Sequence, residues 1–281
     1  MRGALVALTV TALLGGHAAG AGETARQILD RRKALEDTTQ HWNDRQQRMK
    51  LKVTGGAGGE RTRELEVFEK KYPGDEQKAI VFFHAPAEVK DTAFLSFNHK
   101  GRRAEQWLYL PNLKRIRQIT ANIRHESFVG TDLTYHDLDL LAEMTSWSED
   151  DARSQLRGDE TIDGTPCHAI ELTPQREDIG YQRVVLWLGR DDLAPRQVEF
   201  YEQPSGSGWS LFGGGGSDAT PKKRVRQSDV RLVGQIPFAY RVDVESPGTG
   251  SKTGIDITEV RFDQHLADDF FSQRQMELGV R

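Results

Sequence analysis

Two neighbouring stretches decide the fold, Gln106-Trp-Leu-Tyr-Leu-Pro-Asn-Leu-Lys-Arg-Ile-Arg-Gln-Ile119 and Ser127-Phe-Val-Gly-Thr-Asp-Leu-Thr-Tyr135. The large apolar and aromatic side chains of Trp107 to Leu110 are typical of a short strand. Pro111-Asn112 ends that strand, because proline fixes φ and lacks the amide hydrogen that a sheet uses. Lys114 to Ile119 then predicts a second strand with basic side chains on both faces. Such a hairpin supplies aromatic groups but no nucleophile, metal cluster or phosphate loop, which favours holding an apolar ligand over catalysis.

Short strands separated by turn signals extend over most of the chain. Lys78 to Phe83 is almost continuously apolar and is expected to be buried on both faces of a sheet. Phe238 to Glu245 alternates between apolar and polar side chains, so one of its faces should meet water. Within Thr253 to Phe262 the apolar positions change parity, which predicts a β-bulge or a switch of sides near Glu259.

The predicted fold is mainly β (α+β). We expect a strongly bent antiparallel sheet, or half-open β-barrel, of about eleven strands, because helices and strands do not alternate as in a parallel α/β sheet. Helices are expected at Glu23–Gln40, Thr134–Met144 and Asp268–Leu278, and they should cover the concave face. Thr134-x-x-Asp137 has the form of a capping box. Residues 22–281 should form one domain.

Met1 to Ala21 has the features of a secretory signal peptide. Arg2 precedes an apolar core from Ala4 to Leu14, and Ala19-Gly20-Ala21 resembles a cleavage site. The apolar run is shorter than the roughly 20 residues that a membrane-spanning helix needs. We therefore expect an exported, periplasmic protein with no transmembrane segment in the mature chain.

Composition argues against several classes of function. Loss of Arg2 changes the formal net charge from −4 to −5, and an acidic chain offers no electrostatic basis for binding nucleic acid. The basic run Lys222-Lys223-Arg224 is interpreted as a solvated strand end. Cys167 is the single cysteine, so no intrachain disulfide is expected, and it should be a small core residue.

The residues also carry little sign of catalysis. The histidines after Ala21 do not form the His-x-x-x-His, His-x-His or Glu-x-x-His spacings of metal sites. His136, Asp137 and Asp139 cluster in the first turn of a predicted helix, where acidic residues favour the helix dipole without a metal. A Gly-x-Ser-x-Gly elbow and a phosphate-binding loop are both missing from the sequence. No enzyme activity, metal or cofactor is predicted.

The opening stretch resembles the periplasmic outer-membrane lipoprotein-sorting proteins, the LolA/LolB-like family with its large uncharacterised branch. The similarity extends more weakly from about Ile28 to Phe270. The matching residues are Trp107, Tyr109, Leu110, Pro111, Lys114, Arg115, Arg117, Ser127, Phe128, Gly130, Thr131, Asp132, Thr134, Tyr135 and Asp137. The resemblance implies a half-open barrel that is closed by helices and binds acyl chains.

Aromatic side chains are the candidate ligand-binding residues. They could fill a solid core, or some could line an incompletely filled cavity between the bent sheet and the helices. The resemblance favours the cavity, with Trp107 and Tyr109 as its first candidates. The proposed lining is Phe82, Phe94, Phe97, Trp107, Tyr109, Phe128, Trp187 and Phe200.

A glycine-rich segment, residues 203–220, is expected to be a flexible loop. Trp209, Leu211 and Phe212 lie in its middle. They could contact a partner or the mouth of a cavity, or they could fold back onto the core.

The sequence thus predicts a non-enzymatic periplasmic carrier that binds lipid or lipoprotein acyl chains for transfer toward the outer membrane. The resemblance implies an inner-membrane transporter and an outer-membrane acceptor as partners. The alternative is an envelope sensor or scaffold that binds a protein partner through the Trp209–Phe212 loop.

Overall fold

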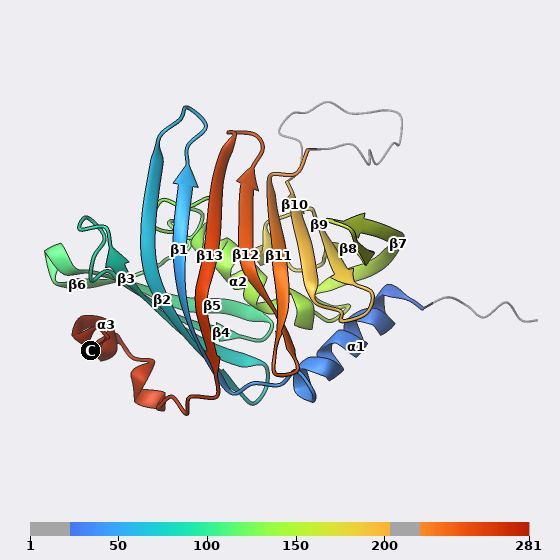
Figure 1. Cartoon of the computed structure of the whole chain (residues 1–281), viewed down its shortest axis with the longest axis horizontal. Helices are drawn as coiled ribbons and strands as arrows, with labels where there is room; N and C mark the ends of the chain where they lie inside the picture. The colour runs from blue at the N-terminus through green and yellow to red at the C-terminus, as the bar shows by residue number, and fades with distance from the viewer. Residues whose placement is uncertain (1–22, 203–219, 281) are drawn as a thin grey trace, which may run out of the picture.

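A computed structural model describes residues 23–202 and 220–280 of the chain. Its thirteen strands form one antiparallel sheet with the order β6-β5-β4-β3-β2-β1-β13-β12-β11-β10-β9-β8-β7 (Figure 1). The strands are β1 (Asp44–Thr54), β2 (Glu60–Tyr72), β3 (Glu76–Ala85), β4 (Ala93–His99), β5 (Arg102–Leu110), β6 (Arg115–Gln118), β7 (Ala152–Ile162), β8 (Thr165–Pro174), β9 (Arg183–Gly189), β10 (Pro195–Tyr201), β11 (Lys223–Val233), β12 (Ile236–Ser246) and β13 (Ser251–Phe262). The helices are α1 (Ala25–Asp37), α2 (Tyr135–Glu143) and α3 (Gln273–Leu278).

The sheet consists of two meanders joined at its centre. Strands β1 to β6 follow one another toward one edge, and β7 to β13 lead from the other edge inward. The joint is the pairing of β1 with β13, where Arg48 lies opposite Glu259 and Met49 opposite Ile257. Thr258 is therefore the extra residue of a β-bulge, which confirms the irregularity expected near Glu259.

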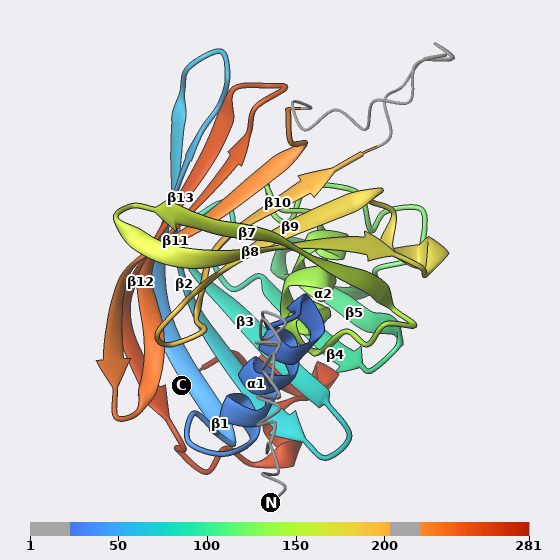
Figure 2. The same ribbon diagram turned by 90° about the vertical axis from the view of Figure 1, so that its right-hand side faces the viewer.

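The topology explains why α2 lies across the concave face. Strands β6 and β7 are consecutive in sequence but form opposite edges of the sheet. The segment that joins them, residues 119–151, must cross from edge to edge, and α2 is part of it. Figure 2 shows α1 and α2 inside the curve of the sheet. The predicted bent, unclosed antiparallel sheet is confirmed, with α1 and α2 on its concave side. The prediction that the C-terminal helix also covers the concave face is wrong, because the apolar side chains of α3 and the segment before it pack against Phe68, Ile80 and Phe82 on the convex face.

The concave face is filled over one half of the sheet. Ile28 and Leu29 of α1 and Leu140 of α2 pack against β8 to β11 in one buried apolar cluster. The cluster is continuous and includes Phe200. In the other half, over β1 to β4, the apolar side chains leave part of the space beside α2 empty.

The convex face is also covered near β2 to β5. The chain after β13 returns across it, and Phe271 and Met276 are buried against Phe68, Ile80 and Phe82. Lys78 to Phe83 of β3 is consequently covered on both sides over its apolar part, as predicted. Among the described residues, no helix combines the length and apolar character needed to cross a membrane.

The structure has thirteen strands where about eleven were expected, and β7 is a strand that the sequence prediction missed. The structure has β7 at one edge, and its residues are mostly polar and alternate between exposed and half-buried. An edge strand with little apolar burial lacks the composition from which strands are recognised.

Candidate ligand cavity

The half-filled part of the concave face contains a cavity of about 220 Å³. It lies between β1 to β4 and β13 on one side, and α2 with the loop before it on the other. An engineered apolar cavity of about 150 Å³ is large enough to bind benzene, so this volume can hold part of a hydrocarbon chain. The lining residues are Met49, Leu51, Leu65, Val67, Glu69, Ala79, Val81, Phe94, Ser96, Asn98, Phe128, Thr131, Leu133, Leu138, Ala142, Thr253 and Ile255.

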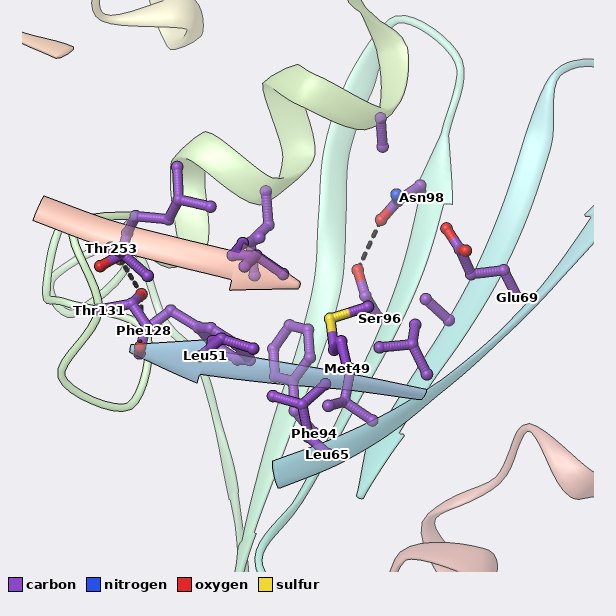
Figure 3. Close-up of a pocket in the computed structure, with 17 residues that line it drawn as sticks. Met49, Leu51, Leu65, Glu69, Phe94, Ser96, Asn98, Phe128, Thr131 and Thr253 are labelled. Carbon is purple, nitrogen blue, oxygen red and sulfur yellow. Dashed lines mark hydrogen bonds between the residues drawn. The ribbon is translucent and has the colours of Figure 1, made fainter. Parts of the chain in front are cut away.

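Strand register orders the concave side chains into cross-strand rows that change from apolar to polar. The first rows are mainly apolar and comprise Ile255, Leu51 and Arg63, then Ile257, Met49, Leu65 and Phe83, then Val260, Gln47, Val67, Val81, Phe94 and Leu108. The next two, here called the polar rows, comprise Phe262, Arg45, Glu69, Ala79, Ser96 and Gln106, then Lys71, Gln77 and Asn98. Figure 3 shows this gradient, with Glu69, Ser96 and Asn98 gathered at one end of the cavity.

The loop before α2 closes the apolar end. Asp132 accepts hydrogen bonds from the Thr253 hydroxyl (2.7 Å) and the Ser246 hydroxyl (2.9 Å), which tie the loop to β12 and β13. Phe128 packs against Phe94, with ring centroids 5.1 Å apart. The residues of the sequence motif are therefore positioned to seal one end of the cavity.

A buried polar cluster fixes α2 over the sheet. The Asp137 carboxylate accepts hydrogen bonds from Lys223 of β11, from the Tyr181 hydroxyl (2.7 Å) and from the Thr134 backbone amide (2.7 Å). Burial favours the neutral acid, but the Lys223 ammonium and these hydrogen bonds hold the pKa of Asp137 below its ordinary value. Thr134 and Asp137 also form the predicted capping box. An ionised Asp137 thus joins α2 to the filled half of the sheet.

Three further buried groups hold the other side of α2. His136 Nε2 lies 2.7 Å from the Ile179 carbonyl, and Arg124 donates to His136 Nδ1, so the ring is a neutral Nε2–H tautomer. Burial, together with the nearby Arg124 charge, lowers the pKa of His136 to about 4. Asp139 accepts from Gln106 at 2.5 Å, and burial raises its pKa to about 7. The cluster ties α2 to β5 and to the loop before β9.

The structure places the aromatic residues proposed from the sequence in different parts of the fold, and only two of them line the cavity. Phe94 and Phe128 line the cavity. Phe82, Phe97, Trp107 and Tyr109 belong to the convex cluster under the C-terminal segment, on the opposite face of the sheet. Trp187 lies in a convex cluster with Cys167, and Phe200 lies beneath the helices in the filled half. The hairpin aromatics Trp107 and Tyr109 thus point away from the cavity, because strand side chains alternate between faces.

Other predicted residues have different outcomes. Trp209, Leu211 and Phe212 lie outside the described residues. Sequence reasoning missed most of the lining, since Met49, Leu65 and Val81 look like ordinary strand positions. It also interpreted Lys223 as solvated, which is wrong, because Lys223 is buried against Asp137. Asp132 was part of the sequence motif, but the motif does not reveal that its hydrogen-bond partners are Ser246 and Thr253.

The cavity and the bent, unclosed sheet define a class of fold, and comparisons identify that class. One family model, described only as an uncharacterized protein, matches residues 75–207, slightly under half of the chain. No curated protein matches the chain.

Three solved structures are similar over nearly their whole length. A candidate outer membrane lipoprotein-sorting protein domain from Vibrio parahaemolyticus has a TM-score of 0.75 and 24% identity, covering 89% of this chain and 97% of that one. A DUF1329 family protein from Desulfovibrio piger has a TM-score of 0.76 and 23% identity, covering 90% and 98%. A LolA superfamily protein from Nitrosomonas europaea has a TM-score of 0.63 and 19% identity, covering 90% and 99%.

Identities of this size establish the fold. The chain has the fold of the LolA-like lipoprotein-sorting proteins, and the resemblance inferred from the sequence motif is confirmed at that level.

Proposed function

We propose that this protein is a non-enzymatic periplasmic carrier that shields acyl chains of a lipid or lipoprotein in the cavity beside α2. The observation that carries the proposal is the contrast between the two halves of the concave face. Helices fill one half with a continuous apolar cluster, whereas the other half keeps an apolar hollow of about 220 Å³. The similar fold of a lipoprotein-sorting protein domain supports the same function.

Burial of hydrocarbon provides the affinity. Scaling from the cavity of about 150 Å³ that takes up benzene, the present volume holds about nine carbon atoms. At about 0.8 kcal/mol for each buried methylene, these contribute about 7 kcal/mol before the cost of immobilising the ligand. Dissociation constants in the micromolar range or weaker are therefore expected, which suits a carrier that must release its cargo.

Directional transfer needs partners. By resemblance to the family, an inner-membrane transporter would load the carrier and an outer-membrane acceptor would unload it. Release then requires the acceptor to offer a better site for the chain than this cavity does.

A matched pair of variants tests acyl-chain binding. Met49→Trp places an indole in the cavity, whereas Lys50→Trp places the same group on the outer face of the same strand, where Lys50 is exposed. Binding of a fluorescent fatty acid to delipidated protein is measured by titration. We expect Met49→Trp to weaken binding about tenfold or more, equivalent to about 1.4 kcal/mol, and Lys50→Trp to leave it unchanged. Failure of the unaltered protein to bind the fatty acid, or equal binding by both variants, would refute the proposal.

A further inference from the structure

The cavity has one closed apolar end and one polar end. Leu51, Phe128, Thr131 and Thr253 at the closed end are all at most 7% exposed. At the other end Glu69 and Asn98 are half-buried, and on the facing side of α2 Leu138 is half-buried and Ala142 is exposed. Among the described lining residues, charged and amide side chains lie only near the mouth, whereas the Thr131 and Thr253 hydroxyls at the closed end already donate hydrogen bonds within the protein. The apolar part of a ligand must therefore lie deeper.

Glu69, the one charged side chain among the described residues of the lining, is already neutralised. Its carboxylate accepts hydrogen bonds from Arg45 (2.7 Å), Gln47 (2.8 Å) and Gln77 (3.0 Å). Arg45 Nη2 also lies 2.5 Å from the same carboxylate. With its charge balanced and its acceptors used, Glu69 offers little to a cationic headgroup.

Two hydrogen-bond donors of the last polar row, Asn98 in the cavity lining and Lys71 two strands away, have no acceptor in the described part of the chain. Asn98 Oδ1 accepts from the Ser96 hydroxyl at 2.5 Å, which leaves the two amide hydrogens of Asn98 for a ligand. The Lys71 ammonium has no ion-pair partner among the described residues and lies over the Trp42 ring, 4.3 Å from its centroid. Burial lowers the pKa of Lys71, so an anion beside it would stabilise its charge. Lys71 and Asn98 lie in the same polar row on strands that are two apart, so their backbones are separated by about 10 Å.

Volume limits the apolar part of the ligand. Space for about nine carbon atoms accepts a section of one chain but not two chains side by side. The wall formed by Phe128, Leu51 and the Asp132–Thr253 hydrogen bond prevents a second chain from extending through that end.

We propose that the cavity selects single-chain amphiphiles with an anionic head, the tail lying toward Leu51 and Phe128 and the head beside Asn98 in the polar row that also carries the positive charge of Lys71. This inference rests on the proposed carrier function and specifies the class of its ligand.

Headgroup selection is tested with three ligands that share one tail. Dodecanoate, dodecyl maltoside and dodecyltrimethylammonium compete, below their micellar concentrations, with a fluorescent fatty acid on delipidated protein. We expect dodecanoate to compete about tenfold better than the cation, because a charged hydrogen bond replaces an unfavourable contact. Lys71→Met and Asn98→Leu should each reduce this preference several-fold without changing dodecyl maltoside binding. Lys78→Met, which removes a half-buried lysine lying over rings on the opposite face, is the matched control.

Chain number is tested with lysophosphatidic acid and phosphatidic acid, which share an anionic phosphate and differ in having one or two chains. Only the single-chain lipid should compete at micromolar concentration. Equal competition by the two lipids would overturn the single-chain inference, and equal competition by the three dodecyl compounds would overturn head selection. In both cases the carrier function would stand, whereas no binding of any acyl compound would reject both proposals.

Discussion

Lys223 of β11 donates a hydrogen bond to the Asp137 carboxylate of α2, and their side chains are only 8% and 0% exposed. This pair joins α2, the helix that covers the cavity, to the filled half of the sheet, over which the cavity does not extend. Because the charges are removed from water, the pair depends on both partners being present. The relationship leads to a prediction about stability.

Lys223→Met should destabilise the protein by about 3–5 kcal/mol, since it leaves an uncompensated buried carboxylate. The double variant Lys223→Met/Asp137→Leu should recover part of that loss. Unfolding in urea, followed by tryptophan fluorescence, measures both. Lys222→Met is the matched control, because Lys222 and Glu202 form an exposed pair, 52% and 49% exposed, that should contribute less than about 1 kcal/mol. Equal losses for the two single variants would contradict the prediction.

Asp139 should make the protein lose stability as the pH rises. Burial raises the pKa of Asp139 from 3.8 to about 7, so between these values the unfolded chain ionises while the folded protein stays protonated. The stabilisation is complete below about pH 4 and is lost as pH rises through 7, with a slope of up to about 1.4 kcal/mol for each pH unit. Asp139→Asn should flatten this part of the profile in urea unfolding at several pH values. A variant profile that parallels the original would exclude Asp139 as the source.

His136 should have the opposite dependence and a fixed tautomer. Its pKa falls from 6.5 to about 4 through burial, so the stability it contributes is present above pH 6.5 and is lost as pH falls toward 4. Nitrogen-15 NMR at pH 6 should find a protonated Nε2, which donates to Ile179, and an unprotonated Nδ1, which accepts from Arg124. An imidazolium at pH 6 would show that the hydrogen bonds are arranged differently.

Trp107 should matter for stability and not for acyl binding. It packs edge-on against Phe97 on the convex face, with centroids 5.1 Å apart. Trp107→Leu should cost about 1–3 kcal/mol and leave fatty acid affinity within about twofold. Phe94→Ala, at the cavity wall, should instead change the affinity or the preferred chain length. The comparison uses the same fluorescence titration, and a large loss of binding in Trp107→Leu alone would reverse the assignment of faces.

Sequence patterns predicted what depends on local chemistry. The apolar run of β3, the capping box at Thr134 and the bulge near Glu259 each follow from side chains close in sequence, and the structure contains all three. The bent sheet with helices on its concave side followed from these patterns together with the family resemblance.

The site could not be predicted in the same way, because it depends on which face of each strand is concave. Trp107 and Phe94 are both aromatic strand residues, yet their rings lie on opposite sides of the sheet. Parity within one strand is visible in the sequence, but the parity of one strand relative to another depends on turns and bulges. Lys223 was misjudged for a related reason, since its partner lies 86 positions away on α2.

The seam between β1 and β13 has a consequence for how the chain acquires its structure. Arg45 of β1 pairs with Phe262 of β13, so the centre of the sheet cannot form until the last strand of the sheet has been synthesised. Contacts that close such a large loop slow folding. In a chain interrupted before Ser251, β1 would be an unpaired edge strand beside the apolar cavity. Such an exposed apolar edge promotes aggregation.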